Sequence, residues 1–487
     1  MKTGYKTLRN NLIVFFLAAQ VLSFSGCKKF LDVNENPNNP VNADPSLLLP
    51  TVEASIGQLV GNSFQIYGNF FAQYWTQNPS SSQYRSLEQY RLANANFDRP
   101  WLTAYRNALQ NAQLIIDDQS PNNERIRGIA QILKAYTFQL ATDAFGDIPL
   151  SEALRGNQVT SPRYESQQTV YDSIFRYIDL GLSIIGTANA ISPGEQDLIF
   201  QGDVDNWRRF ANTLKLRAYL RLSEVSPGTA ETGIAALFDG DNEFLEEDAS
   251  IQYATIGGNE NPLYNEILGL GRTQNMVASG TAVTAYLRNN DPRVFRFYEP
   301  LPESDTIAYI AQGTYASNTD KEVSPPSALV GGQALNAVSA TAPVKLISAA
   351  ESYFLQAEAV ARGWAPGNLD GLFEQGVRES FEALGIPEEA DEYLDEAPDA
   401  QLPGASEGNV RTIITQKYYA MNGFQGFEAW VEWRRTGFPD FLEASAASTL
   451  ATGRMPLRLL YPNNEITTNQ NFPGTRLIYE PVWWDVD

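Results

Sequence analysis

Apolar residues recur at steps of three and four positions through much of the first half of the chain. One such series, between residues 125 and 150, consists of Ile126, Ile129, Leu133, Tyr136 and Leu140. Residues at this spacing share one face of a helix, so the series predicts an amphipathic helix. Gly146 and Pro149 follow the series and predict where the helix ends.

Three further series have the same spacing. They are Trp101, Tyr105, Ala108 and Ala112; Val170, Ile174 and Ile178; and Trp207, Phe210, Leu214 and Ala218. Helices with alanine and aromatic stripes, separated by short turns, are typical of stacked helix pairs of the tetratricopeptide kind, although the sequence has no strict period. We therefore predict a helical scaffold over residues 46–238.

The pattern changes between residues 239 and 344, which are rich in Gly, Pro and Asn. This composition predicts long loops with short strands. Loops of this length on a rigid scaffold tend to be functional, so the segment is a candidate binding region.

Helical spacing returns in residues 345–435. Tyr353, Ala357 and Val360 or Ala361 share a predicted face, and further helices are predicted over 369–384 and 412–433. The acidic stretch 387–409 between these two helices predicts a solvated loop. Residues 436–487 are irregular and rich in Asn. Together, residues 46–487 are predicted to form a single domain.

The N-terminus has the pattern of an export signal. Lys2, Lys6 and Arg9 precede an apolar run over 12–24, which is short for a transmembrane helix, and no later stretch is long and apolar enough to be one. We predict a signal peptide over residues 1–26.

Cys27 follows this signal and is the single cysteine of the 487-residue chain. Small residues precede it in "SFSGC", which resembles a lipoprotein cleavage motif, although Phe24 stands where an aliphatic residue is usual. A buried free thiol is the alternative, but a lone cysteine directly behind a signal favours a lipid anchor. Residues 27–45 are then the lipidated cysteine and a polar tether. A calcium loop at Asp32 is a poorer interpretation, because Pro37 and Ala43 stand at the sixth and twelfth positions, where such a loop needs Gly and Glu.

Charge and composition exclude several classes of function. The formal net charge is -22 and the sequence has no His, so we expect no nucleic-acid partner, no His-dependent catalysis and no zinc site. We also expect no cofactor and no bound metal. Asp239, Asp241 and Glu243 could hold calcium, but a solvated turn is the simpler interpretation.

Several stretches, in order along the mature chain, resemble the SusD/RagB family of outer-membrane nutrient-binding lipoproteins. They are "CKKFLDVNENPNNP", "FFAQYWTQ", "ILKAYTFQLATDAFGDIPLSEAL", "NTLKLRAYLRLSE", "NNDPRVFRFY", "YFLQAEAVARGW", "GFEAWVEWRRTGFP", "RLLYPNNE" and "VWWD". The ordered set is specific, whereas no single stretch is decisive.

The resemblance implies an all-α fold in which tetratricopeptide-like helix pairs support a loop-rich binding face with little β-structure. It also implies a lipid-anchored protein on the outer membrane that binds oligosaccharides, or peptides in some branches. The protein would deliver them to a SusC-like TonB-dependent transporter without catalysis. The alternatives are a lipid-anchored glycoside hydrolase, which needs two suitably spaced carboxylates, and a lid that seals the transporter with little affinity of its own.

A sugar ring is bound by an exposed aromatic face flanked by amide or charged groups. The segment after the first helix supplies such residues: Tyr74, Trp75, Gln77, Asn78, Tyr84 and Arg85. The resemblance makes Trp75 the first candidate, because family members place an aromatic residue there. The alternative is that Tyr74 and Trp75 cap the helix as core residues.

The loop-rich region supplies a second group: Tyr264, Arg272, Asn275, Tyr298, Tyr309 and Tyr315. Of these we select Arg272, Asn275, Tyr309 and Tyr315 as ligand-binding candidates, with packing as the alternative for each. By contrast, we assign Trp430, Trp433, Arg434 and Arg435 to the scaffold, with the arginines paired to carboxylates such as Glu358 or Glu432. Trp483 and Trp484 are expected to dock the C-terminus.

Overall fold

The computed structural model describes residues 45–486 apart from 188–189, 241 and 452. The predicted signal peptide and lipidated Cys27, and all of the tether except its last residue, lie outside the described residues. Residues Pro45–Asp487 form one compact unit. Within the described part of the chain, no helix is both long and apolar enough to cross a bilayer.

The unit is mainly helical, with 55% helix and 5% strand, as the sequence predicted. The first helices are α2 (Pro45–Gln58), α3 (Gln65–Phe71), α4 (Arg85–Glu88), α5 (Asp98–Leu102), α6 (Gln110–Asp117), α7 (Glu124–Phe145), α8 (Gln167–Ile185), α9 (Val204–Arg221) and α10 (Pro227–Phe238). The later ones are α11 (Pro262–Gly269), α12 (Gly280–Arg288), α13 (Val294–Phe297), α14 (Ala337–Thr341), α15 (Ala349–Ala361), α16 (Leu369–Glu382), α17 (Ala390–Glu396), α18 (Ser406–Met421), α19 (Gly426–Thr436) and α20 (Asn463–Thr468).

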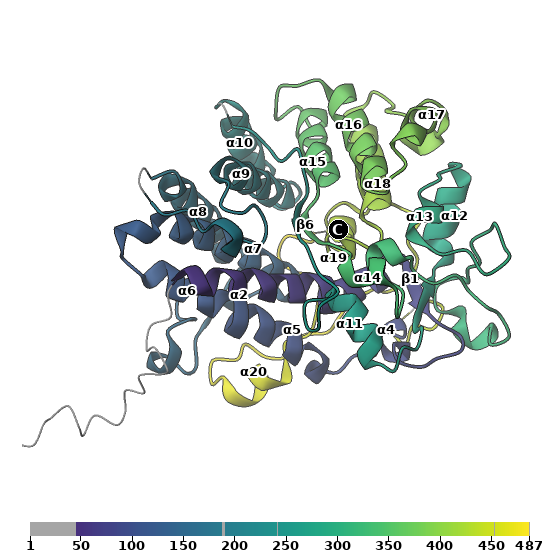
Figure 1. The fold of residues 1–487 in the computed structure, drawn as a ribbon, viewed down its shortest axis with the longest axis horizontal. Coiled ribbons are helices and arrows are strands. Elements are labelled where there is room, and N and C mark those ends of the chain that lie inside the picture. Colours follow the sequence, from purple (N-terminus) through teal and green to yellow (C-terminus); the bar gives the residue numbers. More distant parts are fainter. Residues whose placement is uncertain (1–44, 188–189, 241, 452, 487) are drawn as a thin grey trace, which may run out of the picture. The chain divides into compact units, whose positions relative to one another are not determined.

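Helix α7 lies at the centre of a row of packed helices. Helices α6, α7, α8 and α9 pack in succession, α10 packs on α9, and α15 packs on α16 and α18 (Figure 1). All five residues of the predicted α7 stripe are buried, and the helix ends before Gly146, whose φ is +80°. The stripes of α8 and α9 are also fully buried, which confirms the predicted helical scaffold.

Two predicted loop regions contain helices. The loop-rich region holds α11 and α12, whose first backbone N–H groups are capped by the side chains of Asn261 and Ser279. The acidic stretch holds α17, and its Tyr393 is buried. The prediction of long loops in the first region and of a solvated loop in the second was wrong at these places, because local capping and one buried aromatic ring outweigh a polar composition.

The helices of residues 349–436 also differ from the prediction in detail. In α15, Tyr353 is only partly buried, whereas Glu351, Leu355 and Glu358 are buried, so the predicted face was wrong. The helix predicted over 412–433 is two helices, α18 and α19, with a break at 422–425. The spacing of apolar residues did not identify this face, because two of its positions are the buried carboxylates Glu351 and Glu358.

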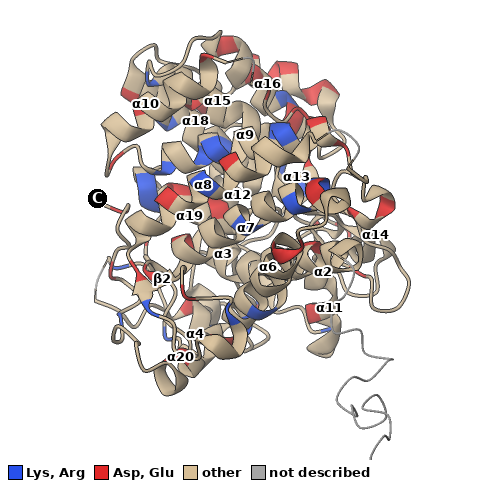
Figure 2. Cartoon of the chain, turned by 90° about the vertical axis from the view of Figure 1, so that its left-hand side faces the viewer, with Lys and Arg blue, Asp and Glu red and all other residues tan. Residues whose placement is uncertain are grey.

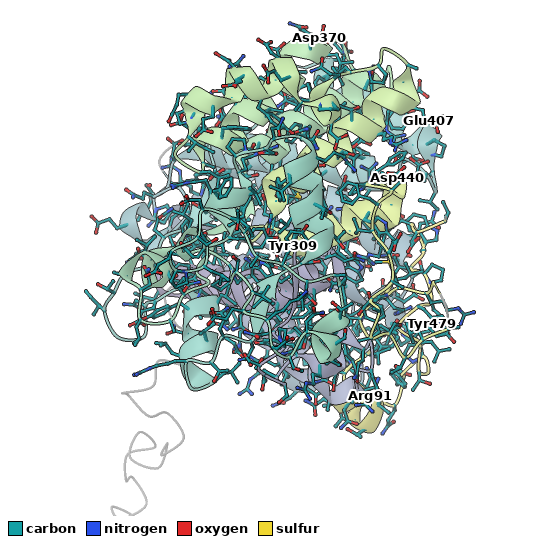
Figure 3. The ribbon with its side chains drawn as sticks, turned by 90° about the vertical axis from the view of Figure 1, so that its right-hand side faces the viewer. Arg91, Tyr309, Asp370, Glu407, Asp440 and Tyr479 are labelled. Atoms are coloured by element: carbon teal, nitrogen blue, oxygen red, sulfur yellow. The ribbon has the colours of Figure 1, made fainter. Side chains whose placement is uncertain are left out.

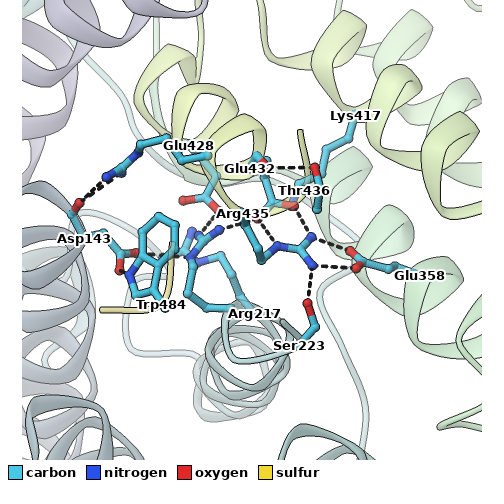
Figure 4. A network of polar contacts seen from close by, with 12 residues as sticks. Asp143, Arg217, Ser223, Glu358, Lys417, Glu428, Glu432, Arg435, Thr436 and Trp484 are labelled. Atoms are coloured by element: carbon cyan, nitrogen blue, oxygen red, sulfur yellow. Dashed lines mark hydrogen bonds and ion pairs between the residues drawn. The ribbon is translucent and has the colours of Figure 1, made fainter. Parts of the chain in front are cut away.

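That inward face belongs to a buried charge network, which Figure 4 shows. Its residues are Asp143, Arg217, Arg221, Glu351, Glu358, Lys417, Glu428, Glu432 and Arg435. Arg435 pairs with Glu358 and Glu432, as the sequence predicted. Trp484 is fully buried and donates from its indole nitrogen to Asp143 Oδ1 at 2.9 Å, so the C-terminal segment docks on this network as expected.

In contrast, acidic residues recur along α16, as the red parts of its ribbon in Figure 2 show. The strands form three antiparallel pairs: β1 (Trp75–Gln77) with β5 (Met276–Ala278), β2 (Ile148–Pro149) with β3 (Tyr164–Glu165), and β4 (Ala249–Ile251) with β6 (Val344–Ile347). The β1–β5 pair joins the segment that follows α3 to the loop-rich region.

Candidate ligand-binding face

The pairing of β1 with β5 brings together the two groups of predicted binding residues. Trp75 lies opposite Ala278 and Gln77 opposite Met276. Beyond the strands, the Asn78 backbone N–H donates to Asn275 O at 3.0 Å, and its side-chain Nδ2 donates to Gln274 O at 2.8 Å. We call the surface formed by residues 78–91, 271–275 and 309–318 the loop face.

The third segment of the loop face is held against the other two. Gly280 N donates to Ile310 O at 2.7 Å, and Gln89 Nε2 donates to the Tyr315 hydroxyl at 2.9 Å. The Arg85 guanidinium lies over the Tyr315 ring at 5.5 Å. Segments far apart in the sequence therefore meet at this face.

Glu88 is the buried centre that fixes these segments. Its Oε2 accepts from Thr76 Oγ1 and from the Gln77 backbone N–H, and its Oε1 accepts from Gln312 Nε2 and Ser445 Oγ, all between 2.9 and 3.1 Å. Burial raises the pKa of Glu88 to about 7, although these hydrogen bonds act in the opposite direction. One carboxyl group thus ties β1, the 309–318 segment and the C-terminal segment together.

Several predicted binding residues lie beneath the face rather than on it. Tyr74 and Trp75 are fully buried, and Tyr74 stacks on Tyr418 with ring centroids 4.4 Å apart. The expectation that Trp75 offers an open ring was wrong: β1 is covered by β5 and by Gln312, which donates to Trp75 O at 3.2 Å. The alternative interpretation, that these rings pack in the core, is what the structure shows.

Gln77, Asn275 and Tyr315 are also buried. Gln77 organises the turn that follows β1, because its side chain donates to Asn78 O and Ser81 Oγ and accepts from Tyr84 N. The prediction that Tyr315 is exposed was therefore wrong. The residue is buried, and its hydroxyl accepts a hydrogen bond from Gln89.

The remaining candidates do reach the surface. Arg272 is exposed, Asn78 and Tyr84 are partly buried, and Tyr309 has 39% of its surface exposed. Figure 3 faces the side of the molecule on which Tyr309 is labelled near the middle, and Arg91, Asp440 and Tyr479 are labelled on the same side. Of the wider set, Tyr264 is partly buried and Tyr298 is fully buried.

The described residues contain no group of three or more acidic or Cys side chains arranged to hold a metal ion. Of the possible calcium ligands, Asp241 lies outside the described residues, and Glu243 pairs with Arg209 at 2.9 Å.

The sequence profile of the SusD-like family, described as starch-binding and associating with the outer membrane, matches residues 37–462. The chain is a SusD-like protein.

Its fold agrees with solved structures. A chitin-binding protein is 25% identical with a TM-score of 0.77, and the match covers 91% of this chain and 100% of that one. A chitin-binding SusD homologue from Flavobacterium johnsoniae is 23% identical with a TM-score of 0.74, over 91% and 98% of the two chains. A SusD homologue from Bacteroides uniformis is 23% identical with a TM-score of 0.76, over 91% and 100%. No protein of curated function matches the sequence.

The SusD-like chain has a groove beside the loop face that sequence reasoning missed. We call it the C-terminal groove; its volume is about 660 Å³, and it is lined by Trp433, Leu442, Glu443, Ala444, Gly453, Arg454, Met455, Leu457 and Tyr479. Trp433 had been assigned to the scaffold, and Arg454 and Tyr479 lie in an irregular segment with no periodicity. The sequence signal for this groove is weak: an Arg and a Tyr in a polar segment without helical periodicity.

Proposed function

We propose that this SusD-like protein is a lipid-anchored outer-membrane protein that captures an oligosaccharide and delivers it to a SusC-like TonB-dependent transporter. The observation that carries the proposal is the likeness to a chitin-binding protein along 91% of the chain, within a family described as starch-binding. The loop face, with Tyr309, Asn78, Tyr84 and Arg272 at its surface, is where we place first contact with the glycan.

The anchor in this proposal is Cys27. The described helices include none that could span a bilayer, and the lone cysteine behind an export signal provides the attachment. Several acyl chains on one residue hold a soluble domain at a membrane, because each buried methylene contributes about 0.8 kcal/mol.

We propose capture rather than hydrolysis. Hydrolysis of a glycosidic bond needs two carboxyl groups on either side of the bond. Among the described residues that line the C-terminal groove, Glu443 is the one carboxylic acid. Carboxyl groups such as Glu88 and Glu358 are buried and engaged in structural contacts.

Calorimetry of the purified protein against neutral and acidic oligosaccharides and protein digests, with product analysis on the same samples, tests the proposal. We expect saturable binding to one glycan class, intact sugars afterwards, and co-purification of the native protein with a TonB-dependent barrel. Release of new reducing ends would contradict the capture role. Binding of peptides alone would replace the ligand class while keeping the uptake role.

A further inference from the structure

The C-terminal groove is built on a hydrogen-bonded segment. Its floor is the segment 455–457, and two side chains of α19 hold it: Trp430 Nε1 donates to Pro456 O at 2.9 Å and Arg434 Nη1 donates to Leu457 O at 2.8 Å. The Leu457 backbone N–H donates to Ile478 O at 2.8 Å, which places Tyr479 beside this floor. A ligand would therefore meet a preformed surface and would not need to order it.

The wall of the groove is tied to the loop face. Gln73 precedes Tyr74 and is fully buried, with a positive φ of 60°. Its Nε2 donates to Glu443 O, and its Oε1 accepts from Thr281 Oγ1 at 2.8 Å. Two residues beyond Glu443, Ser445 donates to Glu88. The groove and the loop face thus share one framework.

The side chains that open into the groove suit a sugar ring. Trp433 is partly buried, which leaves part of a large apolar ring accessible, and the Arg454 guanidinium lies over the Tyr479 ring at 4.2 Å. Glu443 and Arg454 are exposed, and neither forms an ion pair with any residue in the described part of the chain. A carboxylate and a guanidinium beside an aromatic side chain provide hydrogen-bond acceptors and donors for the hydroxyl groups of a sugar. The C–H face of the same sugar ring can rest on the indole of Trp433.

We propose that the C-terminal groove is a second saccharide subsite that binds an uncharged pyranose unit. The charges of Glu443 and Arg454 balance, so the groove has no surplus charge for an acidic sugar, and the chain's net charge of -22 repels anionic glycans. A volume of about 660 Å³ lies within the range of small-ligand sites, roughly 300–1,000 Å³. This inference rests on the proposed glycan-binding function and adds the position and chemistry of a second contact.

The test is calorimetry with neutral oligosaccharides of increasing length, chitin-derived and starch-derived, on the purified protein and on Glu443→Gln, Arg454→Ala and Trp433→Ala. Each variant is expected to lose roughly tenfold in affinity for the longer members, because one charged hydrogen bond or one aromatic contact is removed. The shortest members, which contact the loop face alone, are expected to bind unchanged. Oligosaccharides of uronic acids are expected not to compete.

Trp364→Ala is the matched control. Trp364 is also partly buried and also lies beside an arginine, with Arg362 5.1 Å from its ring centroid, but it does not line the groove. Thermal melting separates folding from binding, and Glu443→Gln and Arg454→Ala change exposed side chains that the fold does not need. Unchanged affinity of both for every length would overturn the subsite while leaving glycan capture intact. Absence of glycan binding in the unaltered protein would overturn the proposed function and the subsite together.

Discussion

Arg435 and Glu358 form a bidentate ion pair inside the protein, in which Nη1 contacts Oε1 and Nη2 contacts Oε2, both at 2.7 Å. Both side chains are buried, and they join α19 to α15. Arg435 also contacts Glu432 and the hydroxyl of Ser223, so its charge is satisfied on several sides. Such a pair contributes little net stability over an apolar replacement, but the loss of one partner leaves a buried charge.

Glu358→Ala is therefore expected to lower the free energy of unfolding by about 3–5 kcal/mol, because Arg435 loses its bidentate partner. Urea unfolding followed by tryptophan fluorescence measures the change. The control is Asp440→Ala, which breaks the ion pair with Arg411, where both side chains are about half exposed. That change should cost about 1 kcal/mol or less. Equal effects of the two substitutions would show that burial of the Glu358 pair does not matter.

A second prediction concerns Gly68, where α3 meets the start of α19. A Cβ at this position would overlap backbone atoms of Gly426 and Phe427, which cannot move aside as a flexible side chain can. Gly68→Ala should lower stability by at least about 2 kcal/mol in the same assay, against the usual preference for Ala in helices. Gly228 in α10 has open space around its Cβ position, so Gly228→Ala should be neutral or slightly stabilising. A neutral Gly68→Ala would mean that α3 and α19 can separate at little cost.

The sequence predicted the helices whose one apolar face packs on a neighbour. It could not show that α7 is buried on nearly every side from Gly128 to Phe145, because positions such as Lys134, Gln139 and Asp143 look like a solvated face. These residues are buried against polar groups contributed by other helices. Their partners are separated from them by tens to hundreds of positions, which periodicity cannot detect.

For the candidate binding face, the sequence correctly predicted which segments contribute to it, but not which of their side chains are exposed. The segments around residues 75–85 and 272–315 do meet, through the β1–β5 register. Which rings reach solvent depends on what covers them, and Trp75 is covered by residues more than 200 positions away. Trp433 shows the converse, since a residue assigned to the scaffold by its helical spacing borders a groove.

This difference between Trp75 and Tyr309 can be tested directly. Trp75→Ala should lower stability by about 3–5 kcal/mol through the cavity it leaves. Tyr309→Ala removes a ring that is 39% exposed, so it should change stability by less than about 1 kcal/mol and weaken glycan binding. Thermal melting and calorimetry on both variants measure the two effects. If the Trp75→Ala variant kept its stability but lost its affinity for glycan, Trp75 would be a binding residue and not a core residue.

Anchoring by Cys27 gives a fourth prediction. Cys27→Ser should remove the lipid attachment, so the protein should move from the membrane fraction to the soluble fraction when cells are fractionated. Glycan affinity of the released protein should match that of the anchored form, because Cys27 lies outside the compact unit Pro45–Asp487. Membrane retention of the Cys27→Ser variant would contradict the lipid anchor.

The raised pKa of Glu88 predicts how stability depends on pH. In the unfolded chain this carboxyl group titrates near 4.5, whereas in the folded protein burial raises its pKa to about 7. The folded state therefore prefers the protonated form, and its contribution to stability is complete below pH 4.5 and is lost as the pH rises through 7. The loss amounts to about 3 kcal/mol, from 1.36 kcal/mol per pKa unit. Glu88→Gln cannot titrate, so the stability of the unaltered protein relative to this variant should fall by about that amount between pH 4.5 and 8. Urea unfolding across this range measures it. A constant difference would mean that the hydrogen bonds from Thr76, Gln77, Gln312 and Ser445 offset burial and leave the pKa of Glu88 near its value in the unfolded chain.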